Sequence, residues 1–194
     1  MKPSVVNGYD GFGGVHDNVV WCQQDGWMAY TLHNKVIFEN VKTRVQTVLC
    51  DSATQLSTIA LSQDKKLMAV GEGRPSSKTG NSLIYLYDTQ QRKLIQRYTF
   101  HQRGVQSLAF SNTGTHLISI GAQGENNLAI WDLQSGLVVR SCLIKNTNAV
   151  NTVKVDPYVG NGSDHGGEHA VLHIQFSIAG NQGLFNIYRY EIAT

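Results

Sequence analysis

The stretch VQSLAFS at residues 105–111 decides the fold, because the chain holds a near copy of it, LSTIALS, at residues 56–62. Apolar residues recur at alternate positions in both stretches, which predicts a β-strand with one buried face. Each stretch is followed by a short polar turn and by a second apolar run, at 116–121 and at 67–71, that ends in Gly. We therefore expect two β-hairpins of the same design.

Both hairpins continue in the same way. A third apolar run ends on an aromatic residue and Asp, at Tyr87-Asp88 in one unit and at Trp131-Asp132 in the next, and a fourth run follows a short turn. Four short strands per unit are typical of a propeller blade. The 44 residues from Asp88 to Asp132 fall within the roughly 40–45 residues of a WD40 repeat.

The pattern predicts an all-β protein, a WD40-type β-propeller with about four blades of four antiparallel strands. The expected units are a divergent N-terminal blade at 1–50, blades at 51–100 and 101–145, and a fourth blade at 146–194 with a Gly-rich insertion at 159–168. WD40 propellers commonly close with more than four blades. We therefore expect an open propeller, with free strand edges in its first and last units, whose missing blades lie on the same longer polypeptide or on a partner chain.

The opening residues carry a family resemblance. Gly8-Tyr9-Asp10-Gly11 followed by Asn18-Val19-Val20 resembles the hydrophobic motif that begins the first propeller of the echinoderm microtubule-associated protein-like family. Residues 101–110, Ile130-Trp131-Asp132 and 155–158 look like later strands of the same family. WD-repeat proteins of cilia and flagella and a kinase-scaffold branch share much of this pattern, so the subfamily stays open.

The resemblance also implies a hydrogen-bonded network inside each regular blade, made by a His, an Asp, a Ser or Thr, and the Trp. His101, Ser119 and Trp131 match three of these positions, but 123–125 (Gln-Gly-Glu) stands where the Asp is expected. The comparison predicts an incomplete network in this blade. In the preceding blade Tyr87-Asp88 replaces Trp-Asp, and Tyr also offers an apolar ring with a polar tip.

Composition restricts the function. Charged residues make up 15% of the chain and the formal net charge is +2, with no run of basic residues, so no nucleic-acid partner is expected. No apolar stretch reaches the length of a membrane span, and the three cysteines show no metal-binding or disulfide spacing. These features favour a cytoplasmic protein that binds neither nucleic acid nor membrane.

No arrangement of residues supports catalysis. The segment 73–79 lacks the Gly before Lys78 that a phosphate-binding loop needs, and a strand rather than a helix follows it. His165, His169 and His173 are spaced by four, but Gly166-Gly167 argues against a helix there and a strand would hold His169 and His173 about 13 Å apart. The sequence predicts no catalytic residue, metal or cofactor.

Function is expected in polar loops at one end of the blades, since rigid scaffolds place binding residues there. The candidate partner contacts are Arg74, Lys78, Asn81, Gln123, Glu125, Asn161 and Asp164. The resemblance implies a non-enzymatic interaction module associated with microtubules, the cytoskeleton or a cilium, with tubulin or ciliary proteins as partners. The alternative is a scaffold for a signalling or other multiprotein complex that is unrelated to microtubules.

Overall fold

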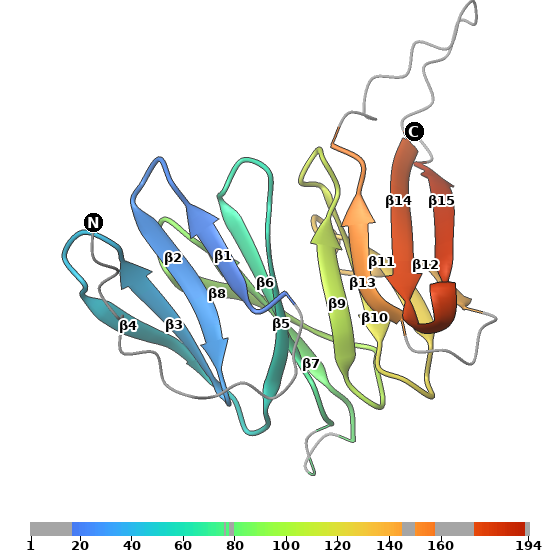
Figure 1. Cartoon of the computed structure of the whole chain (residues 1–194), viewed down its shortest axis with the longest axis horizontal. Helices are drawn as coiled ribbons and strands as arrows, with labels where there is room; N and C mark the ends of the chain where they lie inside the picture. Colours follow the sequence, from blue (N-terminus) through green and yellow to red (C-terminus); the bar gives the residue numbers. More distant parts are fainter. Residues whose placement is uncertain (1–16, 76, 78–79, 145–149, 158–172, 193–194) are drawn as a thin grey trace, which may run out of the picture.

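The structure is a computed structural model that describes residues 17–75, 77, 80–144, 150–157 and 173–192 (Figure 1). Its strands form four antiparallel sheets that follow one another along the chain and fan out in an arc, with the first and fourth sheets at opposite ends (Figure 1). The expected all-β, open propeller is confirmed.

Three of the sheets have four strands each, in sequence order. The first holds β1 (Val19–Cys22), β2 (Trp27–Leu32), β3 (Lys35–Asn40) and β4 (Gln46–Asp51). The second holds β5 (Leu56–Leu61), β6 (Leu67–Glu72), β7 (Leu83–Asp88) and β8 (Lys93–Thr99). The third holds β9 (Val105–Phe110), β10 (His116–Gly121), β11 (Asn127–Asp132) and β12 (Val138–Leu143).

The fourth sheet has three strands within the described residues, where four were expected. They are β13 (Val150–Val155), β14 (His173–Gly180) and β15 (Phe185–Glu191), with a short 3-10 turn, η1 (Asn181–Gly183), between the last two. Among the described strands only β14 pairs with β15, and Phe185 and Ile187 on β15 are largely exposed. This strand therefore presents a free edge.

The repeat seen in the sequence extends to details of strand register. In the second sheet the pairing of the third and fourth strands shifts between Leu86 and Tyr87, and in the third sheet it shifts between Ile130 and Trp131. These are the same positions of the two repeats. A bulge at the same place in these two sheets bends both in the same way.

Three apolar clusters hold the sheets together, one between each pair of successive sheets. At the second interface the Tyr98 ring of β8 lies 4.9 Å from the ring of Trp131 in the next sheet. A Cβ added to Gly71 would lie 2.7 Å from the side chain of Val105, so β6 and β9 meet without space for a side chain. The alternating apolar positions of the strands thus pack against the neighbouring sheets rather than within one blade.

Candidate functional site

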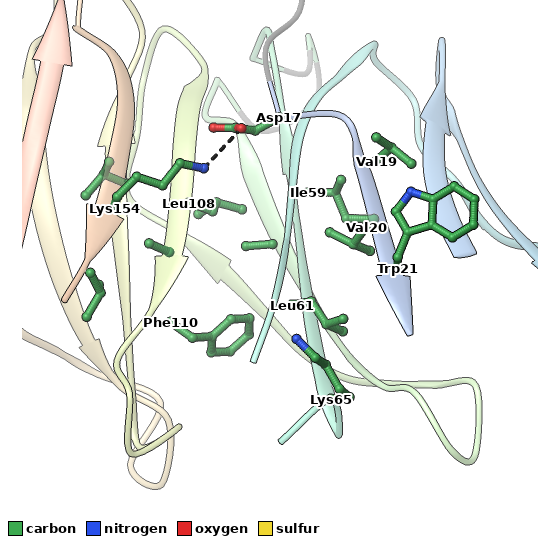
Figure 2. Close-up of a pocket in the computed structure, with 14 residues that line it drawn as sticks. Asp17, Val19, Val20, Trp21, Ile59, Leu61, Lys65, Leu108, Phe110 and Lys154 are labelled. Atoms are coloured by element: carbon green, nitrogen blue, oxygen red, sulfur yellow. Dashed lines mark hydrogen bonds and ion pairs between the residues drawn. The ribbon is translucent and has the colours of Figure 1, made fainter. Parts of the chain in front are cut away.

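An axial pocket of about 310 Å³ lies where the innermost strands of the four sheets face one another (Figure 2). Each innermost strand contributes three consecutive residues rather than alternate ones, because the pocket is bounded by strand edges and not by one sheet face. The lining consists of Asp17, residues 19–21 of β1, 59–61 of β5, Lys65, 108–110 of β9 and 153–155 of β13.

Asp17 spans the pocket near one end (Figure 2). Its main-chain oxygen accepts a hydrogen bond from the Ile59 N–H of β5 at 2.9 Å. Its carboxylate accepts one from the Thr152 hydroxyl of β13 at 2.9 Å and pairs with the Lys154 Nζ at 3.1 Å. One residue thus connects two innermost strands that lie on either side of β9.

The ion pair is not buried. The side chain of Lys154 is 65% exposed and that of Asp17 is 32% exposed. Exposed ion pairs contribute roughly 0–1 kcal/mol, because water screens the charges and ordering the long side chain costs entropy. This contact is therefore weak enough for a ligand to displace.

Sequence reasoning missed Lys154, although the repeat contains a signal for it. The innermost strands align so that Lys154 of β13 occupies the position of Ala60 in β5 and Ala109 in β9. A cation therefore replaces a small apolar residue that the two preceding repeats share. Asp17 had no such signal, because it contacts β13 only after the chain has folded.

The other side chains that line the pocket are apolar, apart from one further cation. Val19 and Trp21 of β1 are exposed, and Trp21 exposes 55% of its surface. Leu61 and Phe110 belong to the walls, and Lys65 lies at the other end of the pocket from Asp17 (Figure 2). The pocket thus combines apolar walls with lysines from two different elements.

A continuous hydrogen-bonded network fixes the loops of the third sheet. The Trp131 indole N–H donates to Ser119 Oγ at 2.9 Å, and Ser119 Oγ lies 2.8 Å from Nε2 of the fully buried His101. Glu125 Oε1 lies 3.0 Å from His101 Nδ1, and its Oε2 accepts the N–H groups of Gln102 and Arg103 at 2.8 Å each. The expectation of an incomplete network is wrong, because Glu125 takes the role in which an Asp was expected.

The donors in this network have fixed directions. Trp is a donor only and an ionised Glu an acceptor only, so Trp131 donates to Ser119 Oγ and Nδ1 of His101 donates to Glu125. Burial alone would raise the pKa of Glu125, but the hydrogen bonds from His101 and from the two backbone N–H groups together lower it below its usual value. The carboxylate is therefore held ionised in the folded chain.

The second sheet uses a different network around a buried carboxylate. Glu72 is fully buried, accepts the Tyr85 hydroxyl at 2.8 Å and the Leu83 N–H at 2.9 Å, and is also bonded by the Ser52 hydroxyl. Burial raises the pKa of Tyr85 to about 12, so its hydroxyl stays protonated as a donor. Tyr87, at the position of Trp131, is buried in the cluster between the first and second sheets.

The two Asp residues of the repeat support the turns after the third strands. Asp88 accepts the Gln91 N–H at 2.7 Å, and Asp132 accepts the Gln134 N–H at 2.8 Å. The bond from Gln134 is the largest cause of a lowered pKa at Asp132. Both carboxylates therefore act within their own turns.

The candidate partner contacts differ in how far their side chains are exposed. Arg74 and Gln123 are exposed, and they lie in equivalent connections between the second and third strands of neighbouring sheets. Asn81 is half-buried in the first of these connections. Glu125 is not available to a partner, since its side chain is 7% exposed and bonded to His101.

Three candidates, Lys78, Asn161 and Asp164, lie outside the described residues. Of the expected loops, those that carry Arg74 and Gln123 lie at equivalent ends of their sheets, because each joins the second and third strands.

Within the described ranges, no three His, Cys, Asp or Glu side chains lie close enough together to hold a metal ion. No helix in that part of the chain is long and apolar enough to cross a membrane. Cys22 and Cys50 are buried, whereas Cys142 on β12 is exposed.

Comparisons with known proteins identify similar chains. Cilia- and flagella-associated protein 52 of Chlamydomonas reinhardtii is 32% identical over 155 residues, which cover 79% of this chain and 25% of that protein. WD repeat-containing protein 90 of Mus musculus is 26% identical over 196 residues, which cover 99% of this chain and 10% of that protein. The chain thus spans a quarter or less of the length of these relatives. No family model matches the chain.

Among solved structures, the crystal structure of RRP9 WD40 repeats superposes with a TM-score of 0.61 at 16% sequence identity. The match covers 88% of this chain and 49% of that one. At this identity the likeness concerns the fold alone.

Proposed function

This chain is built of WD40 repeats, and from that premise we propose that it is a protein-interaction module of a cilium- or flagellum-associated assembly. The observation that carries the proposal is the 32% identity to cilia- and flagella-associated protein 52 over 79% of the chain. The fold alone hosts many functions, so the sequence relatives and not the propeller direct the proposal to the cilium.

The geometry supports interaction as the mode of action. Rigid sheets carry the exposed Arg74 and Gln123 on equivalent connections, and the axial pocket opens between the innermost strands. Such scaffolds position binding groups without requiring them to move. The module would act by holding partner proteins, with no catalytic step of its own.

Microtubules are the narrower partner that we propose. The resemblance of the opening residues to the echinoderm microtubule-associated protein-like family supports this choice. With a net charge of +2, long-range attraction to an acidic microtubule surface is small, so specific contacts must provide the affinity. Arg74 and Lys78 are the candidates, and replacing both by Ala should weaken co-sedimentation with microtubules, while unchanged binding would reject that surface.

Localisation tests the broader proposal. A fluorescently tagged chain expressed in ciliated cells should concentrate on the axoneme or at its base, and should stay there after the membrane has been removed with detergent. A surface variant with both Arg74 and Lys78 replaced separates specific recruitment from trapping. Uniform cytosolic signal together with capture of non-ciliary proteins would favour the alternative, a scaffold for an unrelated complex.

We also propose that further blades complete the arc, on the same longer polypeptide or on a partner chain. The open arc supports this, since successive sheets are joined by apolar clusters between their faces, and the first and fourth sheets each have only one neighbouring sheet in such a cluster among the described residues. Light scattering on the purified chain tests whether further copies of it supply these blades. A folded species at a multiple of 21.4 kDa would mean that copies complete one another, whereas a folded monomer would mean that the arc is stable without additional blades.

A further inference from the structure

Asp17 shows how a residue that carries a carboxylate can bind in the axial pocket. Its main chain hydrogen-bonds to the edge of β5 through Ile59, and its carboxylate lies between Thr152 and Lys154 of β13 (Figure 2). Thr152 and Lys154 are two residues apart on one strand, so their side chains point to the same face and converge on one anion. We name this pair of side chains the carboxylate seat.

We propose that the axial pocket binds an acidic, extended peptide segment of a partner protein, and that a carboxylate of this segment displaces Asp17 from the carboxylate seat. The inference rests on the proposed function, because it names the chemistry of the partner that the module holds. Asp17 is then an internal competitor that occupies the seat while the partner is absent.

Charge in the pocket favours an acidic ligand. Among the described residues, three ionisable side chains line the pocket, and they are Asp17, Lys65 and Lys154. When Asp17 leaves the seat, two lysines face the pocket, and no other described lining residue carries a carboxylate. A ligand with acidic groups at both ends of a short extended stretch would satisfy both of them.

The position of Lys154 in the repeat supports a binding role. The equivalent residues Ala60 and Ala109 take part in packing between sheets, whereas the Lys154 side chain is 65% exposed and forms its ion pair with Asp17. A solvated lysine at that position adds little to stability. Lys154 instead places a cation beside the apolar side chains that line the pocket.

The apolar walls define the remaining part of the ligand. Val19 and Trp21 are exposed beside Leu61, and exposed aromatic side chains at a concave site are common anchors for peptides. The ligand that fits therefore alternates acidic and apolar residues, as an extended strand would present them to the lysines and to the walls.

Peptide titration followed by tryptophan fluorescence tests the inference. Trp21 is exposed, whereas Trp27 and Trp131 are buried, so a change in emission on binding reports on the pocket. The probe is an acetylated and amidated hexapeptide that alternates Glu and Leu, and the control replaces each Glu by Lys. We expect a saturable change with the acidic peptide only, weaker at high salt, and its loss in the Trp21→Phe variant.

Variants of the carboxylate seat give the expected magnitudes. Asp17→Asn keeps a residue that tolerates the left-handed backbone at this position, where φ is 56°, but removes the competing charge. It should tighten peptide binding about two- to fivefold, as expected for loss of an exposed ion pair. Lys154→Met should weaken binding about five- to tenfold, and Lys154→Arg should retain it. Circular dichroism verifies that each variant is folded.

Several outcomes would overturn the inference. These are an equal response to the acidic and basic peptides, an unchanged affinity in folded Asp17→Asn, or equal affinities of the Met and Arg variants at position 154. Ciliary localisation that persists in such a case would leave the proposed function standing and reject only the acidic ligand. Peptide binding without ciliary localisation would reject the proposed function and leave the acidic ligand standing.

Discussion

Replacing Glu125 by Ala should destabilise the third sheet by about 3 kcal/mol. The largest part comes from His101, whose ring is fully buried and would keep an Nδ1–H that water cannot reach. An unsatisfied buried donor costs about 1–3 kcal/mol. The N–H groups of Gln102 and Arg103 belong to exposed residues that water can solvate, so each lost bond adds only about 0.5 kcal/mol.

Urea denaturation followed by tryptophan fluorescence measures this effect, since Trp131 ends the network. With a slope of about 2 kcal/mol per molar urea, the transition of the variant should fall by about 1.5 M. Glu125→Gln keeps a carbonyl acceptor but loses the charge, so it should cost about half as much. Gln123→Ala, at an exposed position of the same loop, should remain within about 0.5 kcal/mol of the parent chain.

The result that would refute this reasoning is a Glu125→Ala transition within about 0.3 M of the parent, because the network would then contribute nothing that solvent cannot replace. A double-mutant cycle with His101→Ala gives an independent verification. If the two side chains form one unit, the double variant should cost less than the sum of the two single variants.

Three other measurements test the remaining physical claims. Because the pKa of Glu125 is lowered in the folded chain, the ionised carboxylate stabilises the fold above its unfolded pKa of about 4.3, and this stabilisation is lost as pH falls through the folded pKa. Urea midpoints measured from pH 7 to pH 3 should show this decline. The decline should be smaller in a Glu125→Gln chain. Gly104→Ala places a Cβ at φ 131°, where it would overlap the carbonyl of Gly73, so a loss of about 2–4 kcal/mol is expected in thermal unfolding, and an unchanged midpoint would contradict the described loop. Tyr85→Phe removes a hydrogen bond to the buried carboxylate of Glu72 and should cost about 1.5–3 kcal/mol in the same assay, while a neutral result would mean that water reaches this site.

Much of the architecture could be predicted because the strands obey a local rule. The runs at 56–62 and 105–111 share one order of residues, with apolar side chains at their first, fourth, fifth and sixth positions, and this shared order identifies both strands. The aromatic-Asp pairs identified the repeat and its length, because each Asp bonds within the turn that directly follows it. Contacts between residues near in sequence leave a pattern that one chain can reveal.

The sequence by itself thus determined the strands, their order within each blade and the type of fold, since all three follow from periodicity and from turns of a few residues. Only the tertiary structure decided that Glu125 completes the network, because a Glu reaches His101 through the path of its loop and not through a motif position. The axial pocket likewise depends on the curvature of the arc, which brings Asp17 to Lys154 across 137 residues of sequence. Contacts over such a separation follow from how successive sheets pack, and no local pattern records that geometry.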